Sequence, residues 1–454
     1  MIERFRASPI VRVCRVLFFF ACLALSVQLF QRSLSAYLPR DFTAAHEFDA
    51  LADWKGARLL LQGKSPYTKE GLALMGQDSM GHPPTTPFWY LPLADFDKSV
   101  AAQVSSALTL FLLPLQVILC ARALRFPVPF ATGLLVSAAV FSTAWFKYHY
   151  DVIQYSEAIA FLYVLAWLFL RQGRDAQAGG LLGAALTLKL FPGLMLVFLL
   201  VARRFRALFA AVASYLAVAL VMTRAYGFGS WVEFFRQQGK ISDDWLGVLQ
   251  NSSLPGLVVR FATPACVAQG HPTRRATLIS LGLSLVLVAL AAWSSRAQLA
   301  DARDRDPRAI DLPFALFVLL SAFLNAWAWE HYFVLTIQPL FVLLATLYGA
   351  WWATLKRWCA GGCSRRRLQL VSAVALLGMA CVVLTVRALN ADFRERDALL
   401  SLWFKYHSEF YHRHMHWLEI ANFACWILPI CACFLGIALT RNQAALGRAR
   451  APDG

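Results

Sequence analysis

Side chains that can carry charge recur at the ends of long apolar segments in this 454-residue chain. Asp49 and Asp53 stand four residues apart at the start of a helical repeat, so they share one face of a helix. Lys189 interrupts an apolar stretch, and His331 lies between two others. A carboxylate suits the role of a general base, while lysine and histidine suit the neutralisation of an anionic group. Together these residue types could bind an anionic compound.

Each of these residues also has a simpler interpretation. Acidic residues are common in the first turn of a helix, where they favour the helix dipole, and spacing alone makes this the commoner role for Asp49 and Asp53. A lysine near the end of a membrane segment can extend its amine to the interface. An ionisable residue inside such a segment is nevertheless a functional hypothesis by default, so Lys189 stays a candidate.

The composition indicates an integral membrane protein. Hydrophobic residues make up 59% of the chain and charged residues 15%, and the apolar runs are long enough to cross a bilayer. The net charge of +17 comes from short basic clusters between apolar segments, a distribution that sets membrane orientation rather than nucleic-acid binding. The ten cysteines lack the spacing of a metal site or a disulfide framework. We expect one integral membrane domain, residues 1–454, with no nucleic-acid partner.

Basic clusters divide the chain so that both termini fall on the cytoplasmic side. Three exoplasmic stretches are expected, residues 32–98, 227–275 and 389–416, and apolar residues at helical spacing in the first predict a short interfacial helix. The result is an all-α polytopic fold with twelve membrane segments: 11–31, 99–121, 128–145, 152–170, two short halves of 176–202, 207–226, 276–295, 312–328, 332–354, 367–388 and 417–440.

The stretch 176–202 decides that count. Crossing once would put the basic residues around Arg171 and those around Arg203 on opposite sides, although both clusters should be cytoplasmic. A break at Phe191–Gly193, which contains a proline, gives two short helices that form a hairpin. Each half is only about 20 Å long at about 1.5 Å per residue, so Lys189 at the tip should lie below the outer surface.

Three stretches resemble glycosyltransferase family 87. From Asp49 to Gly63 the chain follows that family's D-x-x-x-x-[FWY]-x-A-A-R-x-x-L-x-G segment, in which Asp53 falls at a position that is aromatic or apolar in the family. The H-P-P-x7-P-L-A sequence that begins at His82 stands where the family usually has Y-P-P-x7-P-L-A. The run from Ala178 to Pro192 follows A-G-x-x-x-G-x-A-x-x-x-K-x-x-P, with Lys189 at the lysine.

Three shorter stretches show weaker similarity to the family. Gln154 stands at the glutamine of a G-Q-x-N segment, although a glutamine there is more often a helix-packing donor. Asn251 opens an N-S-S-L sequence that is similar to the family's N-Q-S-L. Trp329 to Tyr332 resembles W-x-H-H, and Tyr332 replaces the second histidine.

The resemblance implies a GT-C-type bundle that takes a sugar from a polyprenyl-phosphate carrier, with mannose the first expectation and arabinofuranose an alternative. The acceptor would be a cell-envelope glycolipid or glycan, and the active site would lie on the exoplasmic face of the cell (inner) membrane. Neither a metal nor another cofactor is expected. The implied roles are general base for Asp49, binding of the donor phosphate for Lys189, His331 and Arg58, and substrate binding for Asp53, Tyr67, Gln154, Asn251 and Glu330.

A twelve-span secondary transporter is the alternative function. In such a protein, Lys189 on a broken helix would serve as a coupling or substrate site. The long acidic first loop and the lack of a matching broken segment in the second half speak against a transporter.

Overall fold

The computed structural model describes residues 9–37, 49–76, 80–126, 128–143, 146, 149–150, 153–246, 251–262, 273–304, 306–359 and 426–440, with a few further positions in 364–373 and at 424. Most of the predicted segment 367–388 lies outside these residues, and so does the whole of the predicted third loop, 389–416.

Helices account for nearly all regular structure in the described part of the chain, which contains no strand. The α-helices are α2 (Pro9–Tyr37), α3 (Asp49–Leu61), α4 (Lys69–Met75), α5 (Lys98–Ala123), α6 (Pro129–Phe141), α8 (Ser156–Arg171), α9 (Asp175–Leu188), α10 (Leu194–Val201), α11 (Phe205–Tyr226), α12 (Gly229–Trp245), α13 (Leu254–Ala262), α14 (Arg274–Asp304), α15 (Asp311–Phe323) and α16 (Ile337–Cys359), followed by an unlabelled helix at Trp426–Thr440. Short 3-10 helices are η1 (Thr86–Leu93), η2 (Phe191–Gly193), η4 (Pro307–Ile310) and η5 (Glu330–Thr336).

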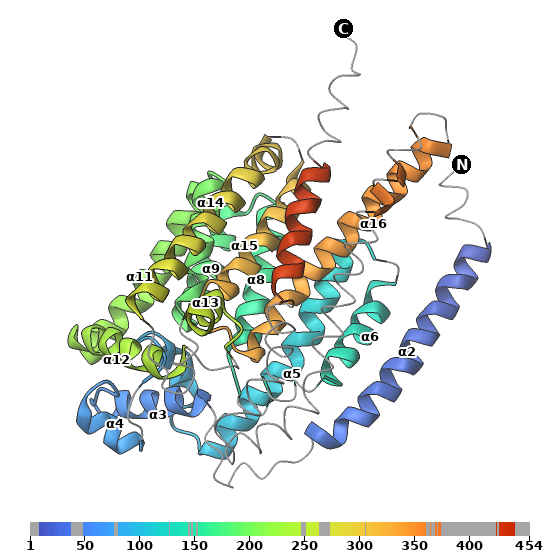
Figure 1. Ribbon diagram of the computed structural model, residues 1–454. Helices are drawn as coiled ribbons and strands as arrows, with labels where there is room; N and C mark the ends of the chain where they lie inside the picture. The colour runs from blue at the N-terminus through green and yellow to red at the C-terminus, as the bar shows by residue number, and fades with distance from the viewer. Residues whose placement is uncertain are drawn as a thin grey trace, which may run out of the picture.

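The long helices run side by side as an upright bundle (Figure 1). Among the described residues, four helices are long and apolar enough to cross a membrane: Lys98–Ala123, Phe205–Tyr226, Arg274–Ala302 and Tyr332–Lys356. Four shorter apolar helices accompany them: Val16–Gln31, Pro129–Phe141, Phe191–Val201 and Trp426–Thr440. The prediction of an all-helical fold is thus confirmed for the described residues, which include four candidate membrane spans, whereas the count of twelve segments stays a prediction.

Contacts of basic residues define one end of the bundle. Arg204 lies 3.3 Å from Asp175 Oδ1 and also donates to the carbonyl oxygen of Ala302, and Arg171 lies 3.3 Å from Asp311 Oδ1. Since these residues begin or end five different helices, the clusters that we predict to be cytoplasmic meet at a common end. Figure 1 shows α3, α4 and α12 at the other end.

The stretch 176–202 is broken, and its two ends meet at that basic end. Helix α9 stops at Leu188, Lys189 is extended (φ −150°, ψ 155°), and η2 with Pro192 leads into α10. Two glycines one turn apart let α9 pack closely on α11: a Cβ at Gly179 would come within 2.0 Å of a backbone oxygen of α11, and one at Gly183 within 2.3 Å. The break therefore leaves Lys189 at the end of the bundle remote from Asp175.

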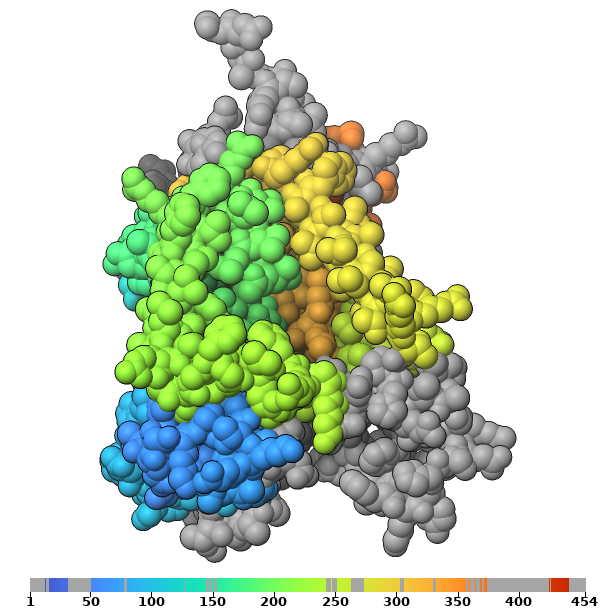
Figure 2. Space-filling view, turned by 90° about the vertical axis from the view of Figure 1, so that its left-hand side faces the viewer, coloured from blue at the N-terminus to red at the C-terminus, as the bar shows by residue number. Residues whose placement is uncertain are grey.

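Helix α3 is packed inside the protein rather than along its surface. Leu51, Trp54 and Leu59 are buried, and the Trp54 indole donates to the Leu93 carbonyl oxygen of η1 (2.9 Å). On the other side, the Tyr226 hydroxyl at the end of α11 donates to the Gly56 carbonyl oxygen (2.9 Å). Figure 2 shows this N-terminal segment directly below the α11–α12 region. The first loop thus forms a layer over the bundle, and its interfacial character stays a prediction.

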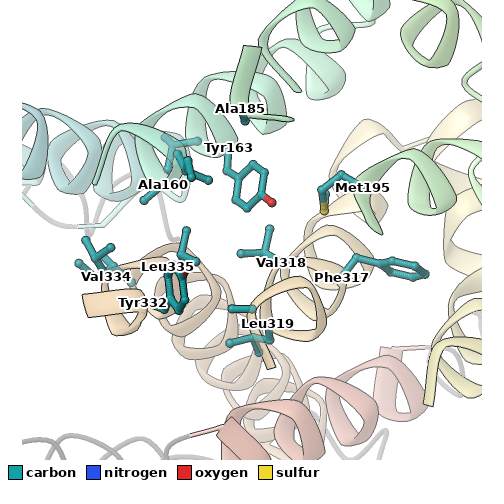
Figure 3. Packing of buried hydrophobic residues seen from close by; sticks show 14 of the residues in the cluster. Ala160, Tyr163, Ala185, Met195, Phe317, Val318, Leu319, Tyr332, Val334 and Leu335 are labelled. Atoms are coloured by element: carbon teal, nitrogen blue, oxygen red, sulfur yellow. The ribbon is translucent and has the colours of Figure 1, made fainter. Parts of the chain in front are cut away.

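The main core lies between α8, α9, α15 and η5. Tyr163, Phe317, Leu319 and Tyr332 are buried there, and Figure 3 shows side chains from these helices converging. Nearly every described residue of α15 is buried, which is the pattern of a helix enclosed by protein on all sides. This rigid centre supports the polar residues at the loop end.

Candidate functional site

The first of the two candidate carboxylates stands at the start of α3. Asp49 is the first residue of that helix, and its side chain lies outside the described set. Asp53 follows one turn later and is fully buried. Residues four apart lie on the same side of a helix, so positions 49 and 53 share one face of α3.

Asp53 is the centre of a buried hydrogen-bonded group. His82 Nδ1 lies 2.6 Å from Asp53 Oδ2, and the Tyr155 hydroxyl donates to the same oxygen. Asp53 Oδ1 is buried and has no hydrogen-bond partner among the described residues. We call Asp53, His82 and Tyr155 the loop-side cluster. It joins the first loop to the segment that begins α8.

The backbone around His82 is held on several sides. The Tyr67 hydroxyl donates to the His82 carbonyl oxygen (2.8 Å), and two glutamines of α12 bond the preceding residues: Gln237 Oε1 accepts from Met80 N (2.7 Å) and Gln238 Nε2 donates to the Gly81 oxygen (3.0 Å). Burial, and then the charge of Asp53, raise the pKa of Tyr67 well above its ordinary value, so this phenol stays protonated. Tyr67, a predicted substrate-binding residue, therefore supports His82.

Lys189 is the centre of a second buried group. Its amine lies 2.8 Å from Gln154 Oε1 and 3.1 Å from the Tyr332 hydroxyl, and it also lies 4.8 Å from the centre of the Tyr332 ring. We call Lys189, Gln154 and Tyr332 the bundle-side cluster. Burial, and then the positive charge of Lys189, lower the pKa of nearby His149 to about 3, so that imidazole is neutral.

The two clusters meet in the chain at consecutive residues, since Gln154 belongs to one and Tyr155 to the other. Ile153, just before them, has a φ of +46°, which is costly for a β-branched residue. Such strain persists only where the surrounding structure fixes it, and it is common at functional sites. The turn therefore directs neighbouring side chains to a carboxylate and to an amine.

The first loop also covers the end of α9. Thr85 Oγ1 donates to the Thr187 carbonyl oxygen (2.7 Å), Thr86 Oγ1 donates to that of Leu188 (3.0 Å), and the Trp89 indole donates to Thr187 Oγ1 (2.9 Å). These bonds satisfy carbonyl groups that have no partner within the helix because α9 ends at Leu188. The H-P-P segment is thereby fixed against the residues that precede Lys189.

Glu330 and His331 open η5, which ends one residue before α16, and their side chains lie outside the described set. Tyr332 is described, and the Phe191 ring lies edge-on to it with centroids 5.0 Å apart. The broken helix therefore contacts Tyr332 through both Lys189 and Phe191.

Asn251 and Arg58 lie in different surroundings. The Asn251 amide nitrogen donates to the carbonyl oxygens of Leu246 and Ala326, and its oxygen accepts from the backbone nitrogens of Ser253 and Ala328. All its hydrogen-bonding capacity thus goes to backbone, which fixes the segment leading into η5. Arg58 is exposed, and its guanidinium lies 4.8 Å from the centre of the Trp54 ring.

Sequence reasoning singled out Asp53, Gln154 and Lys189 but gave no role to Tyr155 and saw His82 and Tyr332 as departures from a motif. No local pattern connected Asp53 with His82, although the two side chains are partners in space. Among the described residues no group of three or more His, Cys, Asp or Glu side chains is arranged to hold a metal ion.

A family model, glycosyltransferase family 87, matches residues 82–324, which is more than half of the chain. The matched range includes His82, Gln154 and Lys189, and it begins after the stretch from Asp49 to Gly63. No curated protein and no solved structure matches the chain.

Proposed function

Because the chain belongs to glycosyltransferase family 87 and is a membrane glycosyltransferase, we propose that it transfers a sugar from a polyprenyl-phosphate carrier to a hydroxyl of a second molecule. The observation that carries this proposal is the bundle-side cluster, in which a buried lysine is held by Gln154 and Tyr332 at the end of a broken helix. A fixed, partly desolvated cation suits a departing phosphate.

Asp49 is proposed as the general base. It shares a side of α3 with Asp53, whose side chain is buried and already engaged by His82 and Tyr155. A general base must come within about 2.6–3.2 Å of the hydroxyl that it deprotonates. Asp53 is fully buried and lacks such access, whereas Asp49 is one helical turn nearer the chain entry into α3.

The proposed step is a displacement at the anomeric carbon. The acceptor hydroxyl gives its proton to Asp49, its oxygen forms a bond to the anomeric carbon, and the bond from that carbon to the phosphate oxygen breaks. The polyprenyl phosphate leaves with the bonding electrons. Lys189, together with His331 and Arg58 as further predicted phosphate ligands, offsets the negative charge that grows on the leaving group.

The substrates follow from the same proposal. Mannose is the first candidate for the sugar, with arabinofuranose second, and a cell-envelope glycolipid or glycan is the acceptor. The loop end of the bundle, where both clusters lie, would face the exoplasm, because the basic clusters gather at the other end. A lipid carrier would then present its head group from the outer leaflet of the inner membrane.

Two isosteric variants test the assignment of the base. Asp49→Asn should lower kcat about 100-fold or more, because the proton acceptor is lost, while the KM for a lipid-linked donor changes little. Asp53→Asn should lower kcat much less, because Asp53 holds neighbouring side chains and does not touch the hydroxyl. Initial rates with a polyprenyl-phosphate mannose donor measure both.

The reverse result, an inactive Asp53→Asn protein and a nearly normal Asp49→Asn protein, would contradict the assignment. The general base would then be Asp53, one helical turn further along α3. In a secondary transporter neither substitution would affect sugar transfer, and both would alter uptake into vesicles. This pair of variants therefore separates the enzyme from the alternative function.

A further inference from the structure

The loop-side cluster contains an imidazole with one engaged and one open nitrogen. His82 Nδ1 lies 2.6 Å from Asp53 Oδ2, and the His82 side chain retains 14% of its exposure while that of Asp53 retains none. Among the described residues, none hydrogen-bonds His82 Nε2. A fully buried carboxylate therefore holds an imidazole that keeps a small exposed fraction.

The bonds at Asp53 fix which nitrogen of His82 carries the proton. The Tyr155 hydroxyl donates to Asp53 Oδ2, and an ionised carboxylate only accepts hydrogen bonds. His82 Nδ1 must then donate to the same oxygen, so in the neutral ring Nε2 holds a lone pair. The Tyr155 ring lies edge-on to the imidazole, with centroids 5.3 Å apart, and limits its rotation.

The backbone that carries His82 is held equally firmly. The three hydrogen bonds from Tyr67, Gln237 and Gln238 at residues 80–82 come from the first loop and from α12. These bonds fix the backbone at residues 80–82, and the contact of Nδ1 with Asp53 fixes the ring on that backbone. A hydrogen-bonding group fixed in this way costs little entropy when a ligand binds it.

We infer that His82 Nε2 accepts a hydrogen bond from a hydroxyl of the bound sugar acceptor, and that Asp53 is the positioning residue for this contact. The inference rests on the proposed function and names the residue that recognises its acceptor. The contact lies on the acceptor side because Asp53 is one turn of α3 from Asp49, whereas the proposed phosphate ligand Lys189 belongs to the other cluster. Asp53 would thus act on the substrate through His82.

Two substitutions at His82 separate the two edges of the ring. In His82→Asn the amide nitrogen can take the place of Nδ1 and still donate to Asp53, but nothing replaces Nε2. In His82→Gln the amide extends to the place of Nε2, but the bond to Asp53 is weakened. An acceptor contact and a purely structural bond to Asp53 therefore predict opposite orders for these two proteins.

The measurement uses the full chain in nanodiscs with a polyprenyl-phosphate mannose donor. Octyl mannoside, octyl glucoside and octyl galactoside are first compared as acceptors, and the one that the unsubstituted protein uses best is kept. His82→Asn should raise the KM for the octyl hexoside about tenfold, the effect of one lost hydrogen bond, with less than a threefold change in the donor KM and in kcat. His82→Gln should keep the acceptor KM within about threefold of the starting value.

The inference is overturned if His82→Asn leaves the acceptor KM unchanged, or if His82→Gln is the more impaired of the two and also has the lower melting temperature. Such a result would mean that only the bond to Asp53 matters. If the unsubstituted protein transfers neither mannose nor arabinofuranose from a polyprenyl-phosphate carrier to any octyl hexoside or other hydroxyl compound, the proposed function itself fails. That outcome is different from any difference between the variants.

Discussion

The loop-side and bundle-side clusters have central residues of opposite charge, and different structural elements hold these residues in place. The loop-side cluster holds the carboxylate of Asp53 between side chains of two loop segments, whereas the bundle-side cluster holds the amine of Lys189 where a helix is interrupted. They are linked through Gln154 and Tyr155. A transfer reaction needs a proton acceptor near one substrate and positive charge near the other. In the proposed mechanism Asp49, one turn of α3 from the loop-side cluster, is the proton acceptor, and Lys189 of the bundle-side cluster supplies the positive charge.

The two clusters also differ in what their burial implies. Lys189 is about 8% exposed, and its amine lies within hydrogen-bonding distance of the Gln154 and Tyr332 side chains. In the proposed mechanism this held cation offsets the negative charge of the departing phosphate. Asp53, by contrast, already receives two hydrogen bonds at one oxygen. The proposed mechanism accordingly gives Lys189 the donor phosphate and Asp53 a positioning role.

Among substitutions that test the difference between the two clusters, the largest loss of activity is expected at Lys189. Lys189→Met keeps the length of the side chain and removes its charge, so transition-state stabilisation of the departing phosphate is lost. We expect kcat/KM for a polyprenyl-phosphate donor to fall about 100-fold, comparable to the loss of one electrostatic stabiliser in other enzymes. Initial-rate kinetics in nanodiscs measure this change.

Lys64→Met is the matched control, because Lys64 lies in the same half of the protein with its amine exposed and paired with Glu70 at the surface (3.2 Å). Its kcat/KM should stay within about twofold of the starting value, since exposed ion pairs contribute little. Equal losses in the two variants would show that net charge, and not the placement of Lys189, supports activity.

A smaller effect is expected at Tyr332. Tyr332→Phe removes the hydroxyl that lies 3.1 Å from the Lys189 amine and keeps the ring that packs on Phe191. Because the amine is then held less firmly, we expect the donor KM to rise about threefold to tenfold, with the acceptor KM unchanged. Separate titrations of donor and acceptor measure the two constants. A rise confined to the acceptor KM would instead place Tyr332 with the loop-side cluster.

The smallest effect is expected at Arg58, which is exposed and lies over Trp54. Arg58→Gln should raise the donor KM about twofold to threefold at low ionic strength, and the difference should vanish near about 0.5 M salt, where exposed charges are screened. Measuring donor KM at two salt concentrations tests this. A loss as large as that of Lys189→Met, and independent of salt, would mean that phosphate contacts come from both sides of the site.

Much of the bundle-side cluster could be predicted from the sequence. An intramembrane lysine close to a proline is rare, so Lys189 attracted a functional hypothesis by itself, and the placement of basic residues required the stretch around it to turn back. These are local patterns within one segment, and such patterns survive in a single sequence. The close contact of α9 with α11 at Gly179 and Gly183, by contrast, was not predicted.

The loop-side cluster could not be predicted in the same way. Asp53 and His82 are 29 residues apart, and Tyr155 is 102 residues from Asp53, so nothing local connects them. Their meeting depends on how η1 and the first loop fold over α9, which is decided by tertiary contacts such as those of Thr85 and Thr86. Spacing alone treated Asp49 and Asp53 alike, and only burial distinguishes a positioning role for Asp53.

The most direct test of the central proposal is the choice of donor by the purified protein. In nanodiscs with an octyl hexoside acceptor, transfer of mannose or arabinofuranose from the matching polyprenyl-phosphate carrier is expected, with release of the polyprenyl phosphate and a rate that collapses in Lys189→Met. The corresponding nucleotide sugar should yield no product above the protein-free background. Robust transfer from the nucleotide sugar without any lipid carrier would contradict the account.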